Sequence, residues 1–549
     1  MRSEEERGML FQWGMRRQQG RMNDNVQQEG PDHSGEASDV PQEPLSAELA
    51  VNIDIIRQKT GESNDVVIRR FALGQEWQIK AAIIFVDGLV DEKNVYEFVL
   101  TPLLQASFPL ALEEKERFQW IEKKLAAVGG VKHISDWGKL FFELFSGATV
   151  MLIDGVPFAV SASTKGGEYR SIEEPQTQIA VRGPREGFTE SLRTNTAMIR
   201  RRIKNPNLWL ETMQIGTVTQ TDVAIMYIKG IANDEIVKEV RARLRRIQID
   251  SVLESGYIEQ LIEDQTFTTF PTTYHTERPD IVAANLLEGR VAVFVEGTPF
   301  VLLAPAVFIQ FFQAVEDYYA RFDIATALRF LRVLIFFLSL VAPAIYIAAT
   351  TFHQEMIPTQ LVIAIAAQRE AVPFPGFVEA LVMEVTFEIL REAGVRLPRA
   401  VGQAVSIVGA LVIGQAAVEA GFVSSSMVIV VSITAIASFA TPSFAIAISA
   451  RLIRFGLMFL AAMFGFYGIM MGLLVMILHL CGLRSFGVPY MSPLAPFIPS
   501  NVGDTLLRVP TWMFRERPRL INQKNIVRQS GEQKPEPPVP SRQEKGDGS

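Results

Sequence analysis

The sequence has almost no cysteine and few histidines, and this excludes several kinds of chemistry. Among its 549 residues only Cys481 is a cysteine, so no internal disulfide can form, and cysteine-based redox or metal chemistry is excluded. The five histidines lie far apart, without the spacing of a metal-ligand set. We therefore expect neither a metal site nor a bound cofactor.

Motifs of the common enzyme classes are also missing. No phosphate-binding loop GxxxxGK[ST] occurs and no GxGxxG follows a strand, while FHQEM at 352–356 resembles HExxH only superficially. No Ser-His-Asp candidate is discernible. The net charge of −7 argues against a nucleic-acid partner. These absences predict that the protein is not an enzyme.

The two ends of the chain lack the apolar residues of a folded core. Residues 1–50 are rich in Gln, Glu, Gly, Ser and Asp, and the tail 522–549 is rich in Pro, Glu and Lys. Both are expected to be disordered. The first 20 residues contain no apolar core of signal-peptide length, which favours a cytoplasmic N-terminal half.

The N-terminal half contains an internal repeat. AAIIFVDGLVDEKNVYEFVLTPL (81–103) matches VAIMYIKGIANDEIVKEVRARLR (223–245), and ATVMLIDGVPFAVSAS (148–163) matches RVAVFVEGTPFVLLAP (290–305). Both matches have the same offset of 142 residues. Each unit reads as a strand, a glycine turn and a helix, followed by a hairpin. We predict an α+β soluble region of two such strand-helix-hairpin subdomains, at 51–181 and 210–305.

Two segments next to the repeats each allow two interpretations. The connector 182–209 holds seven basic residues, which favours a solvated helix or an inter-subunit contact, with anionic lipid headgroups as the alternative. In the uncharged run 297–315 the repeat identifies the first part as a hairpin. The remainder predicts an amphipathic helix at 306–322 that lies along the membrane surface, or else an ordinary core helix. Neither reading makes it a membrane span.

Long uncharged runs predict a polytopic α-helical membrane domain at 329–483 with about five spans. Cytoplasmic loops of membrane proteins carry an excess of Lys and Arg, so we expect the basic segments 391–399 and 451–454 to be cytoplasmic. A single crossing at 455–483 would then put the arginines of the juxtamembrane segment 484–521 outside. Either that run breaks at its glycines or the tail violates the rule. The uncharged runs are 333–352, 400–418, 420–450 and 455–483.

The irregular stretch 358–390 carries charges at membrane depth. Glu384, Glu388 and Glu392 recur at helical spacing and form an acidic stripe, and Arg391 can pair with Glu388 at i+3. Ionisable groups inside a membrane are costly and usually face protein or water. The stripe indicates an ion path or inter-subunit contact, or alternatively an interfacial helix with its acids in water.

The run 400–418 has two distinctive faces. One face carries small residues suited to close helix packing. The other combines valines that could form a hydrophobic gate with polar residues after them, which is typical of a pore lining, although a helix packed in a bundle would also fit. The small residues are Gly402, Ser406 and Gly409, and the candidate pore-lining residues are Val401, Val408, Val412, Gln415 and Glu419.

Several long motifs resemble the A subunits of GerA-type spore germinant receptors. They include TDVAIMYIKGIAN (221–233), TERPDIVAANLLEGRVAVFVEGTPFVLL (276–303), TTFHQEMIPTQLVIAIAAQRE (350–370) and LRSFGVPYMSPLAP (483–496). The resemblance runs from about 60 to 515.

This resemblance implies a location, partners and a mechanism. The location is the inner membrane of a bacterial endospore, with the soluble domain facing the core. The implied partners are a transporter-like, nutrient-binding B subunit, a lipoprotein C subunit and further copies of the chain in a pentamer. The mechanism is a nutrient-gated monovalent cation channel with 400–418 lining the pore. The alternatives are a SpoVAF-like channel subunit without its own sensor and a non-conducting scaffold or relay; a secondary transporter would require an inverted repeat among the spans, and none is visible.

Overall fold

The computed structural model describes most of the chain between residues 44 and 535. The segments expected to be disordered, 1–50 and 522–549, fall mostly outside the described ranges, as does most of the predicted helix 400–418. The described residues are 44–73, 79–105, 114–125, 130–166, 174–178, 180–396, 414–521, 525–529 and 534–535.

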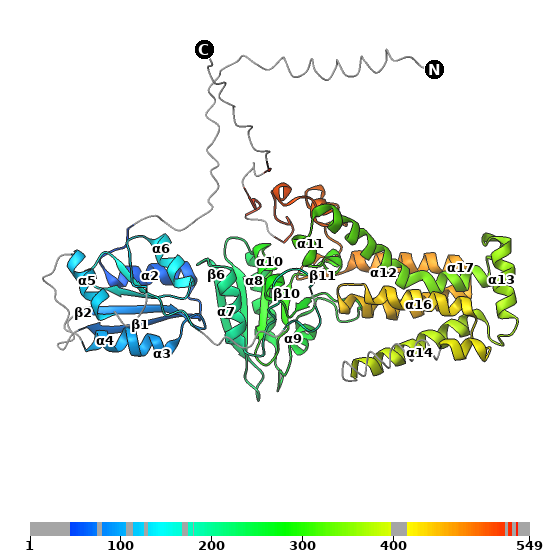
Figure 1. Cartoon of the computed structure of the whole chain (residues 1–549), viewed down its shortest axis with the longest axis horizontal. Coiled ribbons are helices and arrows are strands. Elements are labelled where there is room, and N and C mark those ends of the chain that lie inside the picture. The colour runs from blue at the N-terminus through cyan, green and yellow to red at the C-terminus, as the bar shows by residue number, and fades with distance from the viewer. Residues whose placement is uncertain are drawn as a thin grey trace, which may run out of the picture. The chain divides into compact units, whose positions relative to one another are not determined.

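The first repeat unit folds as a five-stranded antiparallel sheet with helices on both faces. Its elements are α2 (Leu49–Thr60), β1 (Val66–Leu73), β2 (Ile79–Val86), α3 (Glu92–Asn94), the π-helix η1 (Val95–Leu100), α4 (Thr101–Leu104), α5 (Glu114–Lys124), β3 (Lys132–Ile134), α6 (Trp137–Phe145), β4 (Thr149–Ile153) and β5 (Ala159–Ala162). The strand order is β1-β2-β4-β5-β3. Helices α2 and α6 cover one face (Figure 1), and η1, α4 and α5 cover the other. Alternate residues of β2, among them Ile83 and Phe85, pack against Val95 and Val99 of η1.

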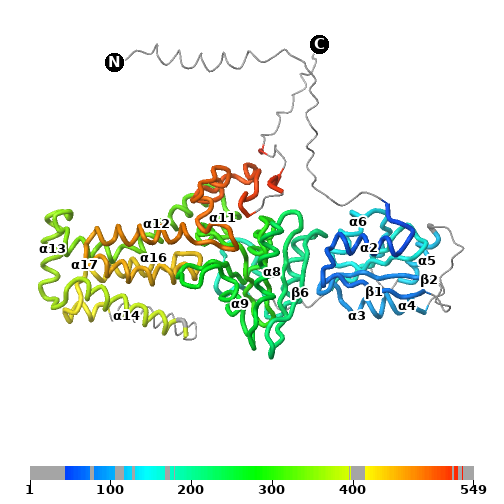
Figure 2. Tube along the Cα trace, turned by 180° about the vertical axis from the view of Figure 1, so that it is seen from behind, coloured from blue at the N-terminus to red at the C-terminus, as the bar shows by residue number. Residues whose placement is uncertain are grey.

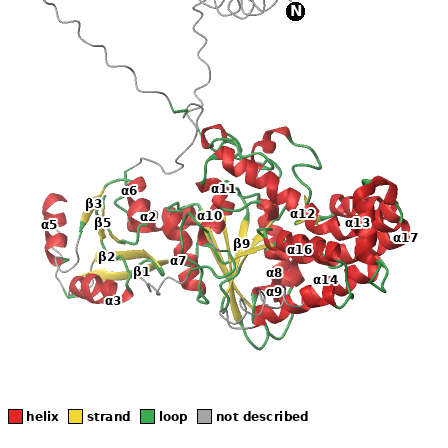
Figure 3. Cartoon of the chain, turned by 45° about the vertical axis from the view of Figure 1, so that its right-hand side comes forward, coloured by secondary structure: helices red, strands yellow, loops and turns green. Residues whose placement is uncertain are grey.

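The second unit repeats this topology. Its elements are α7 (Leu192–Arg202), β6 (Leu208–Ile215), β7 (Thr221–Ile228), α8 (Asp234–Arg246), α9 (Ser255–Ile262), β8 (Tyr274–Thr276), α10 (Pro279–Leu287), β9 (Val291–Val295) and β10 (Val301–Ala304). The strand order β6-β7-β9-β10-β8 matches the first sheet position by position. Figure 3 shows the strands of both sheets between layers of helix. Gly155 and Gly297, with φ of 79° and 90°, form the hairpin turns before β5 and β10. The two antiparallel sheets confirm the predicted repeat.

The predicted connector 182–209 is part of the second subdomain. Helix α7 packs on β7 and β9, and β6 already begins at Leu208. Its Arg200 is fully buried and binds both carboxylate oxygens of Asp65, at 2.7 and 2.9 Å. Arg193 pairs with Asp87, and Arg202 with Glu186. Much of the basic charge of this segment is therefore used in ion pairs within the chain.

The predicted surface helix at 306–322 is absent, and this prediction was wrong. The segment forms the 3₁₀-helix η2 (Phe308–Phe312) and the short helix α11 (Glu316–Tyr319), with a break on either side of α11. The phenylalanines pack in several directions: Phe308 against Tyr490, and Phe312 against Phe336. No apolar stripe is left to face a membrane, because these rings fill the protein interior.

A helix bundle follows the soluble region. In the described part of the chain, two helices are long and apolar enough to cross a membrane, α12 and α17, and α16 is apolar but shorter. Helices α12, α16 and α17 pack side by side (Figure 2), and α14 packs against them. The bounds are α12 (Phe322–Thr351), η3 (Gln354–Met356), α13 (Thr359–Arg369), α14 (Gly376–Arg396), α16 (Ser425–Phe439) and α17 (Phe444–Gly482).

Helix α17 folds back on itself at Gly465. A straight helix would hold Ser449 and His479 about 45 Å apart. Yet the Ser449 hydroxyl donates to the carbonyl of Thr269, and His479 Nε2 hydrogen-bonds the hydroxyl of the neighbouring Thr268 at 2.9 Å. The backbone of Gly465 is non-helical, with φ 59° and ψ −141°. The two arms, 444–464 and 466–482, are therefore antiparallel, and each is close to the length that crosses a bilayer.

This hairpin resolves the open question about the last apolar run, which breaks at its glycines. Both ends of α17 lie at the end of the bundle that touches the second subdomain, which we call the proximal end; Gly465 lies at the distal end. After α17 the chain contacts that subdomain again, because Ser485 Oγ donates to the Thr272 carbonyl at 2.6 Å and accepts from Ala306 N at 2.9 Å. The remaining elements are β11 (Arg484–Ser485), β12 (Val488–Pro489), η4 (Pro499–Asp504) and η5 (Thr511–Met513).

Replacing Gly465 by alanine is expected to destabilise the bundle. A Cβ at this position would lie 2.6 Å from Cε1 of His353, and its φ is left-handed, so strain of about 1–3 kcal/mol adds to the clash. Gly456 is the control, because it lies within the same helix with nothing within 4 Å of the added carbon. Thermal unfolding in detergent should show a lower Tm for Gly465→Ala and an unchanged or higher Tm for Gly456→Ala; equal shifts would argue against the hairpin.

Candidate functional site

Charged residues meet inside the bundle at three levels along α14. Glu384 and Glu388 are four residues apart and share one side of the helix, whereas Glu379, five residues before Glu384, lies on a different side. Each is bound by an arginine from elsewhere in the bundle. We call this set the ion-pair ladder.

The distal level is centred on Glu379, which is fully buried. Its Oε1 accepts from Arg369 Nε at 3.1 Å, and its Oε2 accepts from the backbone N and the hydroxyl of Ser424, at 3.0 and 2.9 Å. Ser424 is also the N-cap of α16, since its hydroxyl accepts from Met427 N. Glu379 thus joins α13, α14 and the start of α16.

The middle level is a single ion pair. Glu384 Oε2 lies 2.5 Å from Arg454 Nη1, and both side chains are 2% exposed. Within the described part of the chain, Glu384 Oε1 and two guanidinium nitrogens of Arg454 have no hydrogen-bond partner. A buried pair with spare donors and a spare acceptor is able to take up water or a passing ion.

The proximal level holds two arginines on one carboxylate. Glu388 binds Arg391 at 3.1 Å, the pair expected from the i+3 spacing, and also Arg451 at 3.0 Å. Arg391 donates to the hydroxyl of Ser438 at 2.9 Å and lies over the ring of Phe439. This level ties α14 to the ends of α16 and α17 that face the second subdomain.

The predicted site residues divide into those in the ladder and those outside it. Glu384 and Glu388 are paired as described, whereas Glu392 is exposed and pairs with Arg396 at 2.6 Å. The stripe is therefore a set of ion pairs, with Glu392 outside the bundle interior. Gln415 donates to Glu419 at 2.8 Å, and both are exposed. Six predicted residues lie outside the described ranges: Val401, Gly402, Ser406, Val408, Gly409 and Val412.

A second buried group of charges joins the soluble region, the start of α12 and the C-terminal segment. We call Asp317, Tyr318, Arg329, Arg332 and Asp504 the junction cluster. Arg329 binds Asp317 and Asp504, both at 3.0 Å. Arg332 also binds Asp317, at 2.8 Å, and the Tyr318 hydroxyl donates to Asp504. The segment 317–332 is thereby held to Asp504 of the C-terminal segment, far along the sequence.

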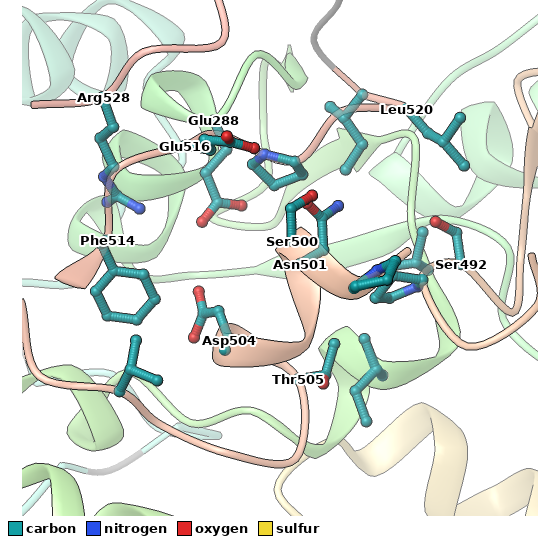
Figure 4. Close-up of a pocket in the computed structure, with 18 of the residues that line it drawn as sticks. Glu288, Ser492, Ser500, Asn501, Asp504, Thr505, Phe514, Glu516, Leu520 and Arg528 are labelled. Atoms are coloured by element: carbon teal, nitrogen blue, oxygen red, sulfur yellow. The ribbon is translucent and has the colours of Figure 1, made fainter. Parts of the chain in front are cut away.

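The junction cluster borders a cavity of about 380 Å³. Figure 4 shows the carboxylates of Glu288 and Asp504 pointing into it, with Phe514 and Arg528 alongside. Burial raises the pKa of both carboxyl groups, and for Asp504 the nearby Arg329 opposes this effect. Burial also raises the pKa of Tyr318 well above its usual range. The cavity therefore has acids that hold a proton more readily than exposed ones.

The family of the chain follows from comparison with known proteins. A family model described as "Bacillus/Clostridium GerA spore germination protein" matches residues 54–520, which include both subdomains, the bundle and the junction cluster. The chain belongs to the GerA family. Within this family the chain corresponds to the receptor A subunits. The members of the family are not enzymes.

Two relatives of this GerA-family chain match over nearly their whole length. Spore germination protein KA of Bacillus subtilis (strain 168) is 61% identical over 493 residues, which is 90% of each chain. Uncharacterized membrane protein YfkQ of the same organism is 45% identical, over 89% of this chain and 94% of its own. A crystal structure of the N-terminal domain of the A subunit of the Bacillus megaterium spore germinant receptor GerK3 is 47% identical, with a TM-score of 0.40; it covers 49% of this chain and all of that one. The chain is a membrane protein.

Sequence reasoning missed several of the residues that organise this GerA-family protein. The sequence analysis did not identify Arg329, Arg369 and Arg454 as partners of buried acids. It also did not identify Asp504 as an acid that binds Arg329. One signal was available: arginines close to long apolar runs need a carboxylate near them, because an unpaired charge there is costly.

Proposed function

We propose that the chain is the A subunit of a nutrient-germinant receptor in the inner membrane of the spore. In this proposal copies of the chain assemble as a pentamer around a channel for monovalent cations. A nutrient-binding B subunit with a transporter-like fold and a lipoprotein C subunit complete the receptor. Membership of the GerA family and the names of the relatives support the receptor role.

The observation that carries the channel proposal is the Glu384–Arg454 pair. It lies in the interior of a bundle of apolar helices, and it retains unpaired polar atoms in the described part of the chain. Ionisable groups at membrane depth are expensive, so they are typical of ion pathways and of contacts between subunits. A purely structural pair would be expected to have more of its hydrogen-bonding atoms satisfied.

In our proposal the pore is lined by one face of the segment 400–418. Val408 and Val412 form a hydrophobic constriction that closes by dewetting, and Val401 lies on the same face. Gln415 and Glu419 are exposed in the single chain. This is expected of residues that line a pore between subunits, because the pore forms only when several copies assemble. Nutrient binding to the B subunit would shift the assembly from the closed to the open state. The size of the shift is set by how much more tightly the nutrient binds the open state than the closed one.

Replacing Val412 by alanine is expected to open this constriction without nutrient. A smaller side chain widens the pore and lets it stay wet, so cells that express the chain with its B and C partners should leak monovalent cations faster than wild type. The leak can be followed by potassium efflux, with insertion levels measured in the same cells. Ile436→Ala is the matched control, because Ile436 is an exposed aliphatic residue on the neighbouring α16.

The opposite result would favour a different function. If Val412→Ala and Val408→Ala are both inserted at normal levels and remain tight, the pore assignment fails. A non-conducting scaffold is then the better reading. Glu379 supports that alternative, because both its carboxylate oxygens are used in fixed contacts between helices.

A further inference from the structure

A cavity of about 390 Å³ lies where the proximal end of the bundle meets the second subdomain. Its walls come from the start of α10, from α11 and α12, from α14 and from the turn between α16 and α17. We call it the interface cavity. It is separate from the middle level of the ion-pair ladder, and its role does not depend on whether the chain conducts ions.

Four arginines line the interface cavity. The exposed fractions of their side chains are low: 2% for Arg278, 13% for Arg332, 9% for Arg391 and 14% for Arg451. Guanidinium groups gathered around one cavity repel one another, and an anion between them lowers this repulsion.

The carboxylates around these arginines leave positive charge facing the cavity. Arg278 binds Asp280, and Arg332 binds Asp317, which it shares with Arg329; neither acid is among the residues that line the cavity. Arg391 and Arg451 share the single carboxylate of Glu388, which leaves one charge uncompensated in this group. The Arg391 Nε is buried and has no hydrogen-bond partner in the described part of the chain.

Acidic side chains are scarce in the cavity itself. Among its described lining residues only Glu316 is acidic; the backbone N of Val181 donates a hydrogen bond to that carboxylate, which keeps its charge. The lining is thus suited to an anion with several oxygens, because guanidinium forks bind such groups through paired N–H donors.

The mouth of the cavity is apolar and aromatic. Phe439 and Phe444, on either side of the turn between α16 and α17, are 68% and 63% exposed, and Ala440 lies beside them. Exposed aromatic rings at the ends of membrane helices are typical of the level of the lipid headgroups. A ligand in this cavity would therefore have its anionic part among the arginines and an apolar part beside the two rings.

We propose that the interface cavity binds the phosphate of an anionic phospholipid, with the glycerol and first acyl methylenes against Phe439 and Phe444. A phosphodiester supplies a negative charge and free oxygens that the N–H groups of the lining arginines can bind. Basic pockets between membrane helices are known sites for such headgroups. The bound lipid joins the second subdomain to α12, α14 and α17.

The test uses the full chain purified in detergent and a substitution that leaves the arginines in place. Ala440 is exposed and lines the mouth, so Ala440→Asp adds a negative charge there without disturbing the buried pairs. Ala440→Asn has the same shape without the charge and is the matched control. Binding of dihexanoyl phosphatidylglycerol is measured by calorimetry and by the rise in Tm, in parallel with dihexanoyl phosphatidylcholine and inorganic phosphate.

We expect phosphatidylglycerol to bind wild type and Ala440→Asn alike, and Ala440→Asp about tenfold more weakly, which corresponds to ~1.4 kcal/mol. Higher salt should reduce the difference. Equal binding of phosphatidylglycerol to all three proteins would overturn the site. If wild type binds phosphatidylcholine as tightly as phosphatidylglycerol, the proposed preference of the cavity for anionic lipid is wrong. If inorganic phosphate binds as tightly as the lipid, the cavity is a site for a free anion and the lipid assignment fails.

Discussion

Replacing Arg454 by methionine is expected to destabilise the protein by about 3–5 kcal/mol, because it leaves the Glu384 carboxylate buried without its partner. The pair is 2% exposed on both sides, so water cannot replace the lost interaction cheaply. The double variant Arg454→Met/Glu384→Leu should recover most of the loss, since neither charge then remains.

The measurement is thermal unfolding of the purified chain in detergent, with the yield of inserted protein as a second readout. Arg396→Met is the control, because the Arg396–Glu392 pair has similar geometry but is 78% and 66% exposed. Its Tm should stay close to that of wild type. Two results would contradict the importance of burial. One is a similar drop in Tm for Arg454→Met and Arg396→Met, and the other is a double variant whose Tm does not recover.

Replacing Arg329 by methionine is the second change with a large expected effect. It removes one guanidinium that binds Asp317, Asp504 and the carbonyls of Thr505 and Leu507. The cost should be near the lower end of about 3–5 kcal/mol, because Arg332 still neutralises Asp317. The C-terminal segment should detach from α12, and limited proteolysis should then cut it between about 499 and 515 far sooner than in wild type.

The Arg329 variant should also change the response to pH. In the folded protein burial raises the pKa of Asp504, so between its unfolded and folded pKa the folded state holds more protons, and stability falls as pH rises. Without Arg329 the folded pKa rises further, and this decline extends to higher pH. Arg321→Met is the control, since its pair with Asp323 is largely exposed. A pH profile parallel to wild type would show that Arg329 does not act on Asp504.

The parts that could be predicted from the sequence are those set by local patterns. The two hairpins followed from a glycine between alternating apolar segments, and both are present at Gly155 and Gly297. The misprediction at 306–322 arose because phenylalanines at helical spacing suit a membrane surface and a protein interior equally well. Only contacts with Tyr490 and Phe336, far along the chain, decided between them.

The ion-pair ladder shows the same limit. Spacing along α14 predicted the local Arg391–Glu388 pair, but it grouped the exposed Glu392 with the two paired acids and left out the buried Glu379. It did not identify Arg454 as the partner of Glu384, because these residues are 70 positions apart and no local period links them. The sequence analysis gives a break at the glycines of the last apolar run as one of two possibilities. Gly465 is the one whose backbone leaves the helical region, with His353 packed against it.

The contacts between the C-terminal segment and the second subdomain determine when this subdomain can finish folding during synthesis on the ribosome. Ala306 N and the hydroxyl of Ser485 that it binds are 179 residues apart. At usual rates of synthesis this is a delay of roughly 10–35 s. Throughout that time the second subdomain exists without its last partners, and the bundle is made in between. The subdomain therefore reaches its final form only after both arms of α17 have been translated.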